Sequence, residues 1–173
     1  MRFDHDNMTG VRLSVALLNL EADGAWTADS VHRTLIDQRI RRPEVTDDVV
    51  ARIHAWTTVL RPIFEAATVE IRCERVNALL ATSAGGVYLS THDGRRPHLH
   101  FTPESDDLLG RIRAVTSGGL AVFAVETGGE RLGLCAHRPC RRVFADTTRG
   151  GRQSYCSPRC ANTEAVRRHR NRT

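Results

Sequence analysis

The sequence contains no lysine, and all 25 of its basic residues are arginine. We attribute this absence to genomic composition bias, because no physical need excludes lysine from every surface. Aromatic residues are also scarce, at 5% of the chain. No apolar run reaches the eighteen or so residues that cross a bilayer, and nothing at the N-terminus resembles a secretory signal. These absences predict a soluble, cytoplasmic protein with no membrane partner.

Common catalytic signatures are missing as well. The chain has no Gly-x-Ser-x-Gly elbow, no P-loop, no G-x-G-x-x-G fingerprint and no His-Glu-x-x-His pair. We therefore expect that the protein is not an enzyme.

Charge is distributed unevenly along the 173 residues, which are enough for one ordinary domain and a small module. Residues 1–134 carry 15 Arg against 18 Asp and Glu, a net charge of −3, whereas residues 135–173 carry 10 Arg against two acids, a net charge of +8. A basic tail on an acidic body is typical of a protein that binds a polyanion, most simply nucleic acid. The alternative is a solvated, disordered basic end.

Four of the five cysteines lie in one stretch, as Cys135-x4-Cys140 and, after a spacer of fifteen residues, Cys156-x3-Cys160. Two short cysteine pairs form two knuckles, and each knuckle offers two thiolates from a tight turn. Because structural Zn²⁺ takes four such ligands at tetrahedral corners, the spacing predicts a zinc site made of all four residues.

Cysteines and histidines in such a stretch also have other roles. Two disulfides would also use four cysteines, but a reducing cytosol keeps such thiols free. His137 lies inside the first knuckle and offers a replacement ligand that a four-cysteine set does not need. Cys73 lies far away in a helical pattern, and we expect it to be a buried core thiol.

The fifteen-residue spacer predicts a small β-structure. Val143 and Phe144 indicate a strand, residues 146–151 a Gly-rich turn, and the residues up to Tyr155 a return strand. Phe144 and Tyr155 would then give the metal its hydrophobic cover.

A helix is predicted directly after the second cysteine pair. Thr163, Arg167 and Arg170 would share one face of it, and Arg168 would pair with Glu164 at i,i+4. A helix rich in arginine and anchored to zinc has a geometry that enters a major groove or lies along phosphates, and the guanidinium fork suits both tasks. We predict a nucleic-acid contact set of seven arginines: Arg141, Arg142, Arg152, Arg159, Arg167, Arg168 and Arg170.

The residues before the finger predict a helical body. Residues 11–22 form an apolar pattern that belongs at its centre. Asn19 within this helix needs a partner, and we expect a hydrogen-bonded core amide rather than a ligand-binding group.

Further helices follow in the body. Thr27 and Thr46 are predicted N-caps of two of them. The helix that starts at Thr46 should break or restart at Pro62, and a further helix should carry residues 63–80.

Another helix should follow residues 103–107, whose acidic side chains suit a helix N-terminus. Gly118 and Gly119 are expected to interrupt it before residues 120–125, which form either a strand or, as we favour, a helix.

A short hairpin is predicted between these helices, with residues 87–91 paired to residues 97–101. His98 and His100 alternate on its second strand and so point to one face. We predict that His98 and His100 line a candidate ligand pocket for a small effector, formed by the hairpin and the N-terminal segment. The alternative is a polar sheet face with hydrogen-bonded histidines, because no close ligand spacing supports a metal there.

The C-terminal stretch resembles the CGNR zinc finger, a module named for a Cys-Gly-Asn-Arg sequence at its last ligand. The matching positions are Cys135, Cys140, Phe144, Asp146, Arg152 to Tyr155, Cys156, Ser157, Cys160 and Asn162. Two positions depart from the pattern, since Ala161 replaces the Gly and Thr163 replaces the Arg.

In that family the finger follows an N-terminal domain called ABATE, and the proteins are described as stress-induced transcription regulators. The VALLNL and HLHF segments of this chain are similar to that domain. The resemblance implies a regulatory N-terminal domain and a DNA-binding finger.

We therefore expect a mainly α protein. A helical domain over residues 1–130 with one small β-hairpin precedes a treble-clef or ribbon-like four-cysteine zinc finger over residues 131–173, which ends in a basic helix. The predicted function is that of a zinc-containing, DNA-binding transcriptional regulator with a regulatory or ligand-sensing N-terminal domain. The alternative is a protein- or RNA-binding adaptor in which the finger is a structural staple. A homo-oligomer is compatible with either function.

Overall fold

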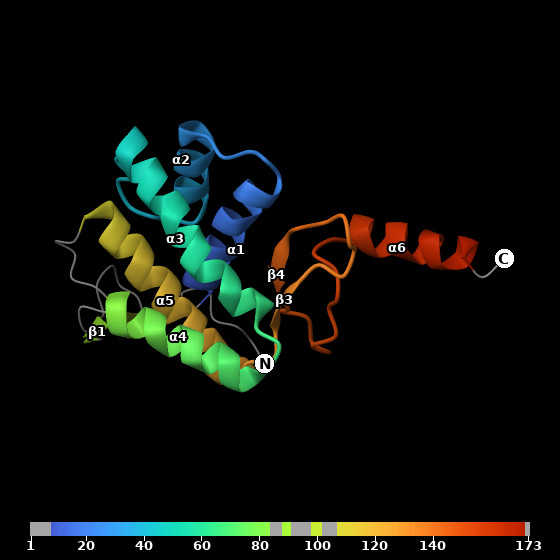
Figure 1. Cartoon of the computed structure of the whole chain (residues 1–173). Coiled ribbons are helices and arrows are strands. Elements are labelled where there is room, and N and C mark those ends of the chain that lie inside the picture. Colours follow the sequence, from blue (N-terminus) through green and yellow to red (C-terminus); the bar gives the residue numbers. More distant parts are fainter. Residues whose placement is uncertain (1–7, 84–87, 91–97, 102–106, 172–173) are drawn as a thin grey trace.

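The computed structural model describes residues 8–83, 88–90, 98–101 and 107–171. These residues form six helices and two antiparallel hairpins, so the expected mainly α fold is confirmed. The helices are α1 (Thr9–Ala22), α2 (Ala28–Asp37), α3 (Asp47–Glu65), α4 (Val69–Ser83), α5 (Leu108–Thr127) and α6 (Pro158–Arg170). The strands are β1 (Tyr88–Ser90), β2 (His98–His100), β3 (Leu132–Leu134) and β4 (Val143–Ala145). Helices α1 to α5 form a body, and β3, β4 and α6 extend from one end of it (Figure 1).

Helix α1 lies at the centre of the body, as its apolar sequence predicts. Val11, Leu13, Leu17 and Leu18 are all completely buried, and they belong to one core cluster with side chains from α2 to α5. Burial of this kind stabilises a fold by roughly 1.5–3 kcal/mol per large aliphatic side chain.

Helix α5 crosses α1 at very close range. A Cβ atom added to Gly119 would lie 2.7 Å from the Cα atom of Gly10, and one added to Gly10 would lie 2.0 Å from the carbonyl oxygen of Val115. The prediction that Gly118 and Gly119 interrupt the helix is wrong, because α5 is continuous. Gly119 serves the crossing, and Gly118 lies against the ring of Phe101, which a Cβ atom would approach to 2.3 Å. Residues 120–125 are helical, as we favoured.

The predicted helix starts at two threonines are confirmed. The Thr27 hydroxyl accepts a hydrogen bond from the Ser30 amide at 3.1 Å, and the Thr46 hydroxyl accepts one from the Val49 amide at 3.4 Å. Helix α5 is capped by Asp107, while residues 102–106 lie outside the described part of the chain. These caps satisfy amides that a helix N-terminus leaves without a partner.

Helix α3 continues through Pro62 and ends at Glu65, so the predicted break at Pro62 is wrong. A proline inside a helix costs about 3 kcal/mol, because it lacks an N–H group and its ring crowds the preceding turn. Here the last turn places Ile63 and Phe64 in the core, at 0% and 2% exposure, and burial of this size offsets the cost. The next helix therefore starts only at Val69.

The buried face of α4 differs from the expected one. Cys73, which we expected in the core, is exposed. The buried positions are Arg72, Val76 and Leu79, which recur at helical spacing. Because Arg72 takes this face, the neighbouring Cys73 is turned toward solvent.

The side chain of Arg72 joins the end of α3 to the start of the C-terminal hairpin. It is 6% exposed and donates hydrogen bonds to the carbonyl groups of Ile63 at 3.0 Å, Ala66 at 3.0 Å, Leu132 at 3.1 Å and Gly129. Burial lowers the pKa of its guanidinium group from the ordinary value, but an arginine keeps its proton in proteins. One buried cation thus satisfies carbonyl groups from three segments.

Asn19 makes a second connection between the body and β4. Its side-chain nitrogen donates to the carbonyl oxygen of Val143 at 3.1 Å, and its side-chain oxygen accepts from the amide of Val143 at 2.9 Å. The expectation of a hydrogen-bonded core amide is confirmed. Leu132 and Val143 also belong to the core cluster of the body, so the hairpin packs directly on it.

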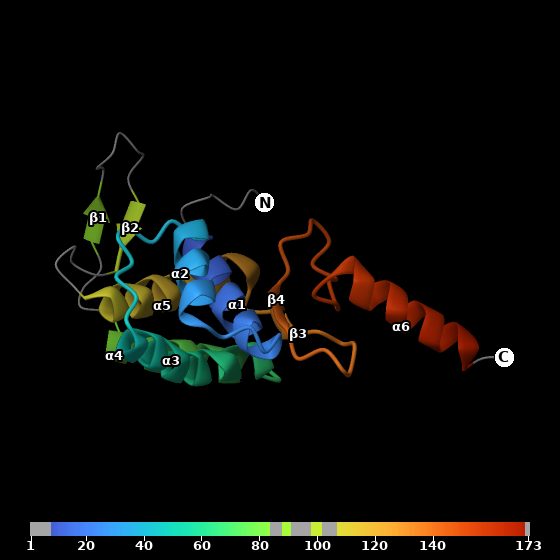
Figure 2. The same ribbon diagram turned by 90° about the horizontal axis from the view of Figure 1, so that it is seen from above.

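The predicted β1–β2 hairpin is present, with Tyr88 opposite His100 and Ser90 opposite His98. It lies at the end of the body opposite to α6 (Figure 2). The side chains of His98 and His100 lie outside the described part of the structure, as do residues 1–7, so the predicted pocket between them stays a prediction.

Helix α5 is the one helix of the described residues that is long and apolar enough to cross a membrane. More than half of its apolar window, 56%, is buried inside the body. This burial is what the core helix of a folded domain shows, and it gives no indication of a membrane protein.

Candidate metal centre

The first cysteine knuckle is the turn of the β3–β4 hairpin. Strands β3 and β4 pair with Leu134 opposite Val143, and the amide of Cys135 extends the ladder by donating to the carbonyl oxygen of Arg142 at 2.9 Å. The predicted pairing of β4 with a return strand that ends at Tyr155 is therefore wrong. The partner strand comes before the knuckle, where Leu132 is buried against the body.

Asp146 organises the loop that follows β4. This carboxylate is 2% exposed and accepts hydrogen bonds from the hydroxyl and amide of Thr148, at 2.6 and 2.8 Å, and from the amide of Gln153 at 2.8 Å. Burial alone would raise the pKa of Asp146, but these hydrogen bonds and the charge of Arg131 outweigh it and lower the pKa from its usual value. The ionised carboxylate fixes the loop that leads to the second cysteine pair.

The second knuckle is the start of α6. Ser157 is its N-cap, and the Ser157 hydroxyl accepts from the amide of Cys160 at 3.3 Å. Pro158 occupies the first turn, where its missing N–H group costs nothing. The amide of Cys156 points to the sulfur of Cys135 at 3.4 Å, so the two knuckles face each other.

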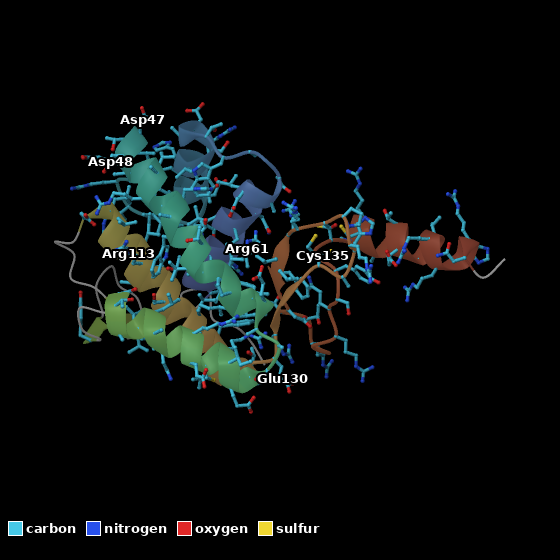
Figure 3. The ribbon with its side chains drawn as sticks, in the orientation of Figure 1. Asp47, Asp48, Arg61, Arg113, Glu130 and Cys135 are labelled. Carbon is cyan, nitrogen blue, oxygen red and sulfur yellow. The ribbon has the colours of Figure 1, made fainter. Side chains whose placement is uncertain are left out.

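The four cysteine sulfur atoms converge on one point. They all lie within 4.8 Å of one another, and the Cys140–Cys156 and Cys156–Cys160 distances are 3.6 and 3.7 Å. A tetrahedron with Zn–S bonds of about 2.3 Å has edges of about 3.8 Å, whereas a disulfide bond measures about 2.05 Å. The spacing fits Zn²⁺ and not two disulfides. The sulfur atoms gather near Cys135, between the hairpin and α6 (Figure 3).

The protein surroundings alone do not favour four thiolates. Burial is the main cause that raises the pKa of Cys140. Burial also raises the pKa of Cys156 to about 12, and there the hydrogen bonds with the three other thiols act in the same direction. The Ser157 hydroxyl lowers the pKa of Cys160. A bound cation supplies the positive charge that holds all four thiols in the ionised form.

Residues 131–173 match the sequence model of the CGNR zinc finger family. No curated protein matches the chain significantly. The family match and the sulfur geometry agree, so Cys135, Cys140, Cys156 and Cys160 form the ligand set for Zn²⁺. The CGNR finger thus combines a hairpin knuckle with a helix knuckle.

Zinc binding changes the charge of the finger. The net charge of +8 for residues 135–173 counts the four thiols as neutral, whereas four thiolates and one Zn²⁺ together carry −2, so these residues carry +6 when zinc is bound. The excess of positive charge therefore survives metal binding.

Glu164 ties α6 to the first knuckle. Its side chain is 9% exposed, accepts from Arg167 at 2.6 Å and lies 3.3 Å from His137 Nδ1. The predicted pair between Glu164 and Arg168 is wrong, because Glu164 uses Arg167 one position earlier. The hydrogen bond from Arg167 is the main cause that lowers the pKa of Glu164, with His137 contributing. His137 thus serves a helix contact and not the metal.

The seven predicted contact arginines fall into two groups. Arg159, Arg167, Arg168 and Arg170 lie on α6, which extends away from the body in both views (Figures 1 and 2). The other three lie in the loops beside the metal: Arg141, Arg142 and Arg152.

The loop arginines differ in their surroundings. Arg142 forms an ion pair with Asp23 of the body at 3.1 Å, and Arg152 is exposed. Arg141 lines a groove of about 540 Å³ between the body and the first knuckle.

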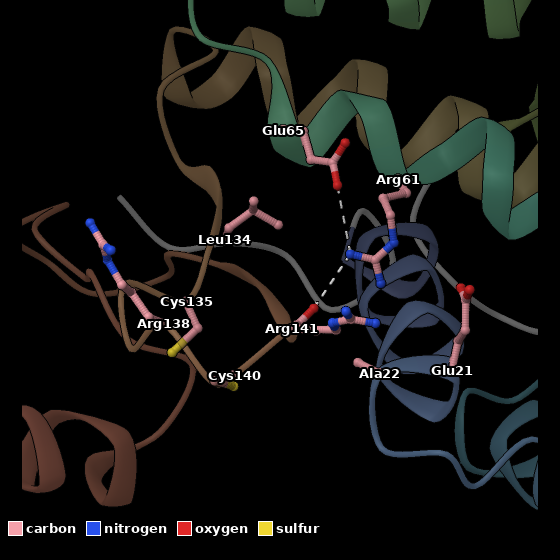
Figure 4. A pocket seen from close by; sticks show the side chains of 9 residues that line it. All are labelled: Glu21, Ala22, Arg61, Glu65, Leu134, Cys135, Arg138, Cys140 and Arg141. Atoms are coloured by element: carbon pink, nitrogen blue, oxygen red, sulfur yellow. Dashed lines mark hydrogen bonds and ion pairs between the residues drawn. The ribbon is translucent and has the colours of Figure 1, made fainter.

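This groove is also lined by two arginines that are not in the predicted contact set, Arg61 and Arg138. Arg61 donates to the carbonyl oxygen of Arg141 at 3.4 Å and lies 3.8 Å from Glu65 (Figure 4). No spacing rule links residue 61 to the finger, because only the docking of α3 on the hairpin brings them together.

Proposed function

We propose that this chain is a DNA-binding transcriptional regulator of the cytoplasm, in which zinc has a structural role. The observation that carries the proposal is the position of α6. This basic helix starts at two of the metal ligands, Cys156 and Cys160, and extends away from the body (Figure 1). A rigidly anchored, protruding helix with several arginines is suited to a DNA groove.

Electrostatics support the same proposal. With zinc bound, residues 135–173 carry +6 on a compact module, and residues 1–134 carry −3. Phosphates attract the finger, while the acidic body keeps the DNA at that end of the molecule.

Catalysis at the metal is not part of this proposal. Four thiolates fill the tetrahedral positions of Zn²⁺ and leave none open for water or substrate. The zinc would hold the two knuckles together and so orient α6.

The N-terminal body is proposed as the regulatory or ligand-sensing part, in keeping with the resemblance of its sequence to an ABATE domain. Its connection to the finger supports this role, because hydrogen bonds of Asn19 and Arg72 link α1 and α4 directly to the hairpin. A small effector would bind the body, and a homo-oligomer would place two fingers on one operator.

The test is a fluorescence titration of the zinc-loaded full chain with duplex DNA at several salt concentrations. Each phosphate contact should add about −0.9 to the slope of log K against log salt. The double variant Arg152→Ala, Arg168→Ala should therefore lower the slope by about two. Glu126→Gln, a charge change in the body, serves as the control that leaves the slope unchanged.

A protein- or RNA-binding adaptor is the competing function. It would be favoured if the loaded chain binds no duplex at low salt, or if its binding does not depend on salt. The exposed Leu134 and Val166, at 43% and 52% exposure, are apolar side chains of the finger that a protein partner would cover.

A further inference from the structure

Helix α6 presents two chemically different faces. Glu164 is buried against the first knuckle, and Cys160 points to the metal. At 3.6 residues per turn the opposite side of the helix carries a row of positions spaced by three or four residues. We call this row the outer stripe, and it consists of Arg159, Asn162, Val166 and Arg170.

The outer stripe is open to solvent. Asn162, Val166 and Arg170, together with Thr163, Arg167 and Asn171, line a shallow groove of about 520 Å³. Val166 is 52% exposed. Thr163, which replaces the Arg of the family pattern, bonds to the carbonyl oxygen of Arg159 at 2.9 Å and so uses its hydroxyl within the helix.

The composition of the stripe does not suit a face that only follows phosphates. A valine side chain forms no hydrogen bond or ion pair with a phosphate, but an apolar side chain packs on the C5-methyl group of thymine. An asparagine amide offers one donor and one acceptor, which match the adenine edge, and an arginine fork matches the guanine edge.

Resting on the proposed function, we propose that the outer stripe reads base edges in the major groove of duplex DNA. Asn162 recognises an adenine, Val166 a thymine methyl group and Arg170 a guanine. The arginines elsewhere on the finger, such as Arg168 and Arg152, contact phosphates. The stripe is thus the part of the finger that determines sequence preference.

The dimensions fit this assignment. Helix α6 has 13 residues, and at about 1.5 Å per residue it is about 20 Å long. The major groove is about 12 Å wide and admits one α-helix. Asn162 and Arg170 are separated by about 12 Å along the axis, which is roughly three to four base pairs at about 3.4 Å each.

Charge complementarity identifies DNA as the occupant of this face. With zinc bound, residues 135–173 carry +6, and the one acidic side chain of α6, Glu164, is turned inward and paired with Arg167. A protein partner would meet Arg159 and Arg170 on either side of one exposed valine, with no acidic side chain on the stripe, which favours a polyanion.

The experiment selects preferred duplexes from a randomised pool with the zinc-loaded full chain, and then compares variants on the preferred and a scrambled duplex. Arg170→Ala should weaken the preference at one G·C pair by roughly 5- to 150-fold, the value of one bidentate base contact. Val166→Ser should weaken the preference at one A·T pair by a smaller factor.

Matched controls lie on the same helix, at positions outside the stripe. Arg168→Ala removes the same charge, and Ala165→Ser makes a change of similar size. Arg168→Ala should weaken binding to both duplexes alike, and Ala165→Ser should change neither. All variants should keep their zinc content and helical circular dichroism, because each altered residue is exposed.

The outcomes separate the two proposals. If the chain binds duplex DNA with no sequence preference, or if Arg170→Ala and Arg168→Ala behave identically, the outer stripe does not read bases and the DNA-binding function stands. If the loaded chain binds no duplex at low salt, or prefers single-stranded RNA, both proposals are wrong.

Discussion

Two buried polar side chains, Arg72 and Asn19, determine at the residue scale how the finger sits on the body. Both reach from a body helix to backbone groups of the hairpin or its connection. Backbone groups at this position are shielded from water and need such partners, since an unsatisfied buried group costs about 1–3 kcal/mol. The junction between body and finger therefore depends on specific hydrogen bonds as well as on apolar packing.

Replacement of Arg72 by methionine should lower the free energy of unfolding by about 3–5 kcal/mol, because four carbonyl groups lose a charged donor at once. The measurement is urea unfolding followed by tryptophan fluorescence. Arg33→Met is the control, since Arg33 is exposed and its side chain bonds to Asp29 and Ser30 of the same helix. Equal effects of the two substitutions would contradict the role of Arg72 at the junction.

Replacement of Asn19 by leucine keeps the volume of the side chain but removes both hydrogen bonds to Val143. We expect a loss of about 2–5 kcal/mol, because one buried amide and one buried carbonyl group stay unsatisfied. Hydrogen exchange at the Val143 amide should accelerate more than exchange in α2. Asn162→Leu, the same change at an exposed site, should have little effect on stability, and an unchanged Val143 exchange rate in Asn19→Leu would refute the contact.

At the scale of elements, the crossing of α1 and α5 sets the architecture of the body. Gly10 and Gly119 bring the two backbones into contact, and this close approach lets the core side chains of both helices interlock. Glycine is a poor helix former by about 1 kcal/mol relative to alanine, so its presence in mid-helix reflects the crossing.

Gly119→Ala tests this explanation, because helix propensity and packing predict opposite signs. Propensity alone would stabilise α5 by about 1 kcal/mol. The new methyl group, 2.7 Å from the Gly10 Cα atom, meets backbone that cannot move aside easily, so we expect a net loss of about 1–3 kcal/mol. Thermal unfolding measures it. Gly150→Ala, with no atom within 4 Å of the added Cβ, is the control, and a stabilised Gly119→Ala protein would disprove the close crossing.

At the scale of the whole molecule, the body and the finger share one apolar core. Leu132 and Val143 from the hairpin belong to the same cluster as Leu17 and Leu60 of the body. The metal centre lies just beyond this hairpin, at Cys135 and Cys140. Loss of the metal therefore affects the body through the hairpin, although most of the core belongs to the body itself.

Removal of zinc should unfold the finger and weaken the body without unfolding it. For Cys156→Ser, or for the wild-type chain with a chelator, we expect circular dichroism to lose little more than the helical signal of α6. The body should then melt at a lower temperature, because the hairpin covers it less well. Native mass spectrometry should count one Zn²⁺ in the wild type. Cys73→Ser, at the exposed cysteine, should keep the metal and the melting temperature, and a chelator that changes nothing would contradict the structural role of zinc.

The sequence by itself was enough to predict the features that depend on short spacing. The four zinc ligands lie in two tight pairs, the N-caps Thr27 and Thr46 act within one turn, and the apolar pattern of residues 11–22 reports the burial of α1. In each case the interacting groups are neighbours along the chain, so periodicity or spacing reveals them. The mainly α fold and the finger followed from such signals.

Only the tertiary structure decided the features that depend on contacts between distant segments. Pro62 is tolerated because the last turn of α3 is buried, Gly119 lies in a continuous helix because Gly10 packs against it, and β4 pairs with β3 because the body covers Leu132. The helical pattern of residues 63–80 does not distinguish Arg72, yet this side chain lies at the junction of three segments. Long-range packing outweighs local preference at these positions, because the free energy gained by burial is as large as the local cost that opposes it.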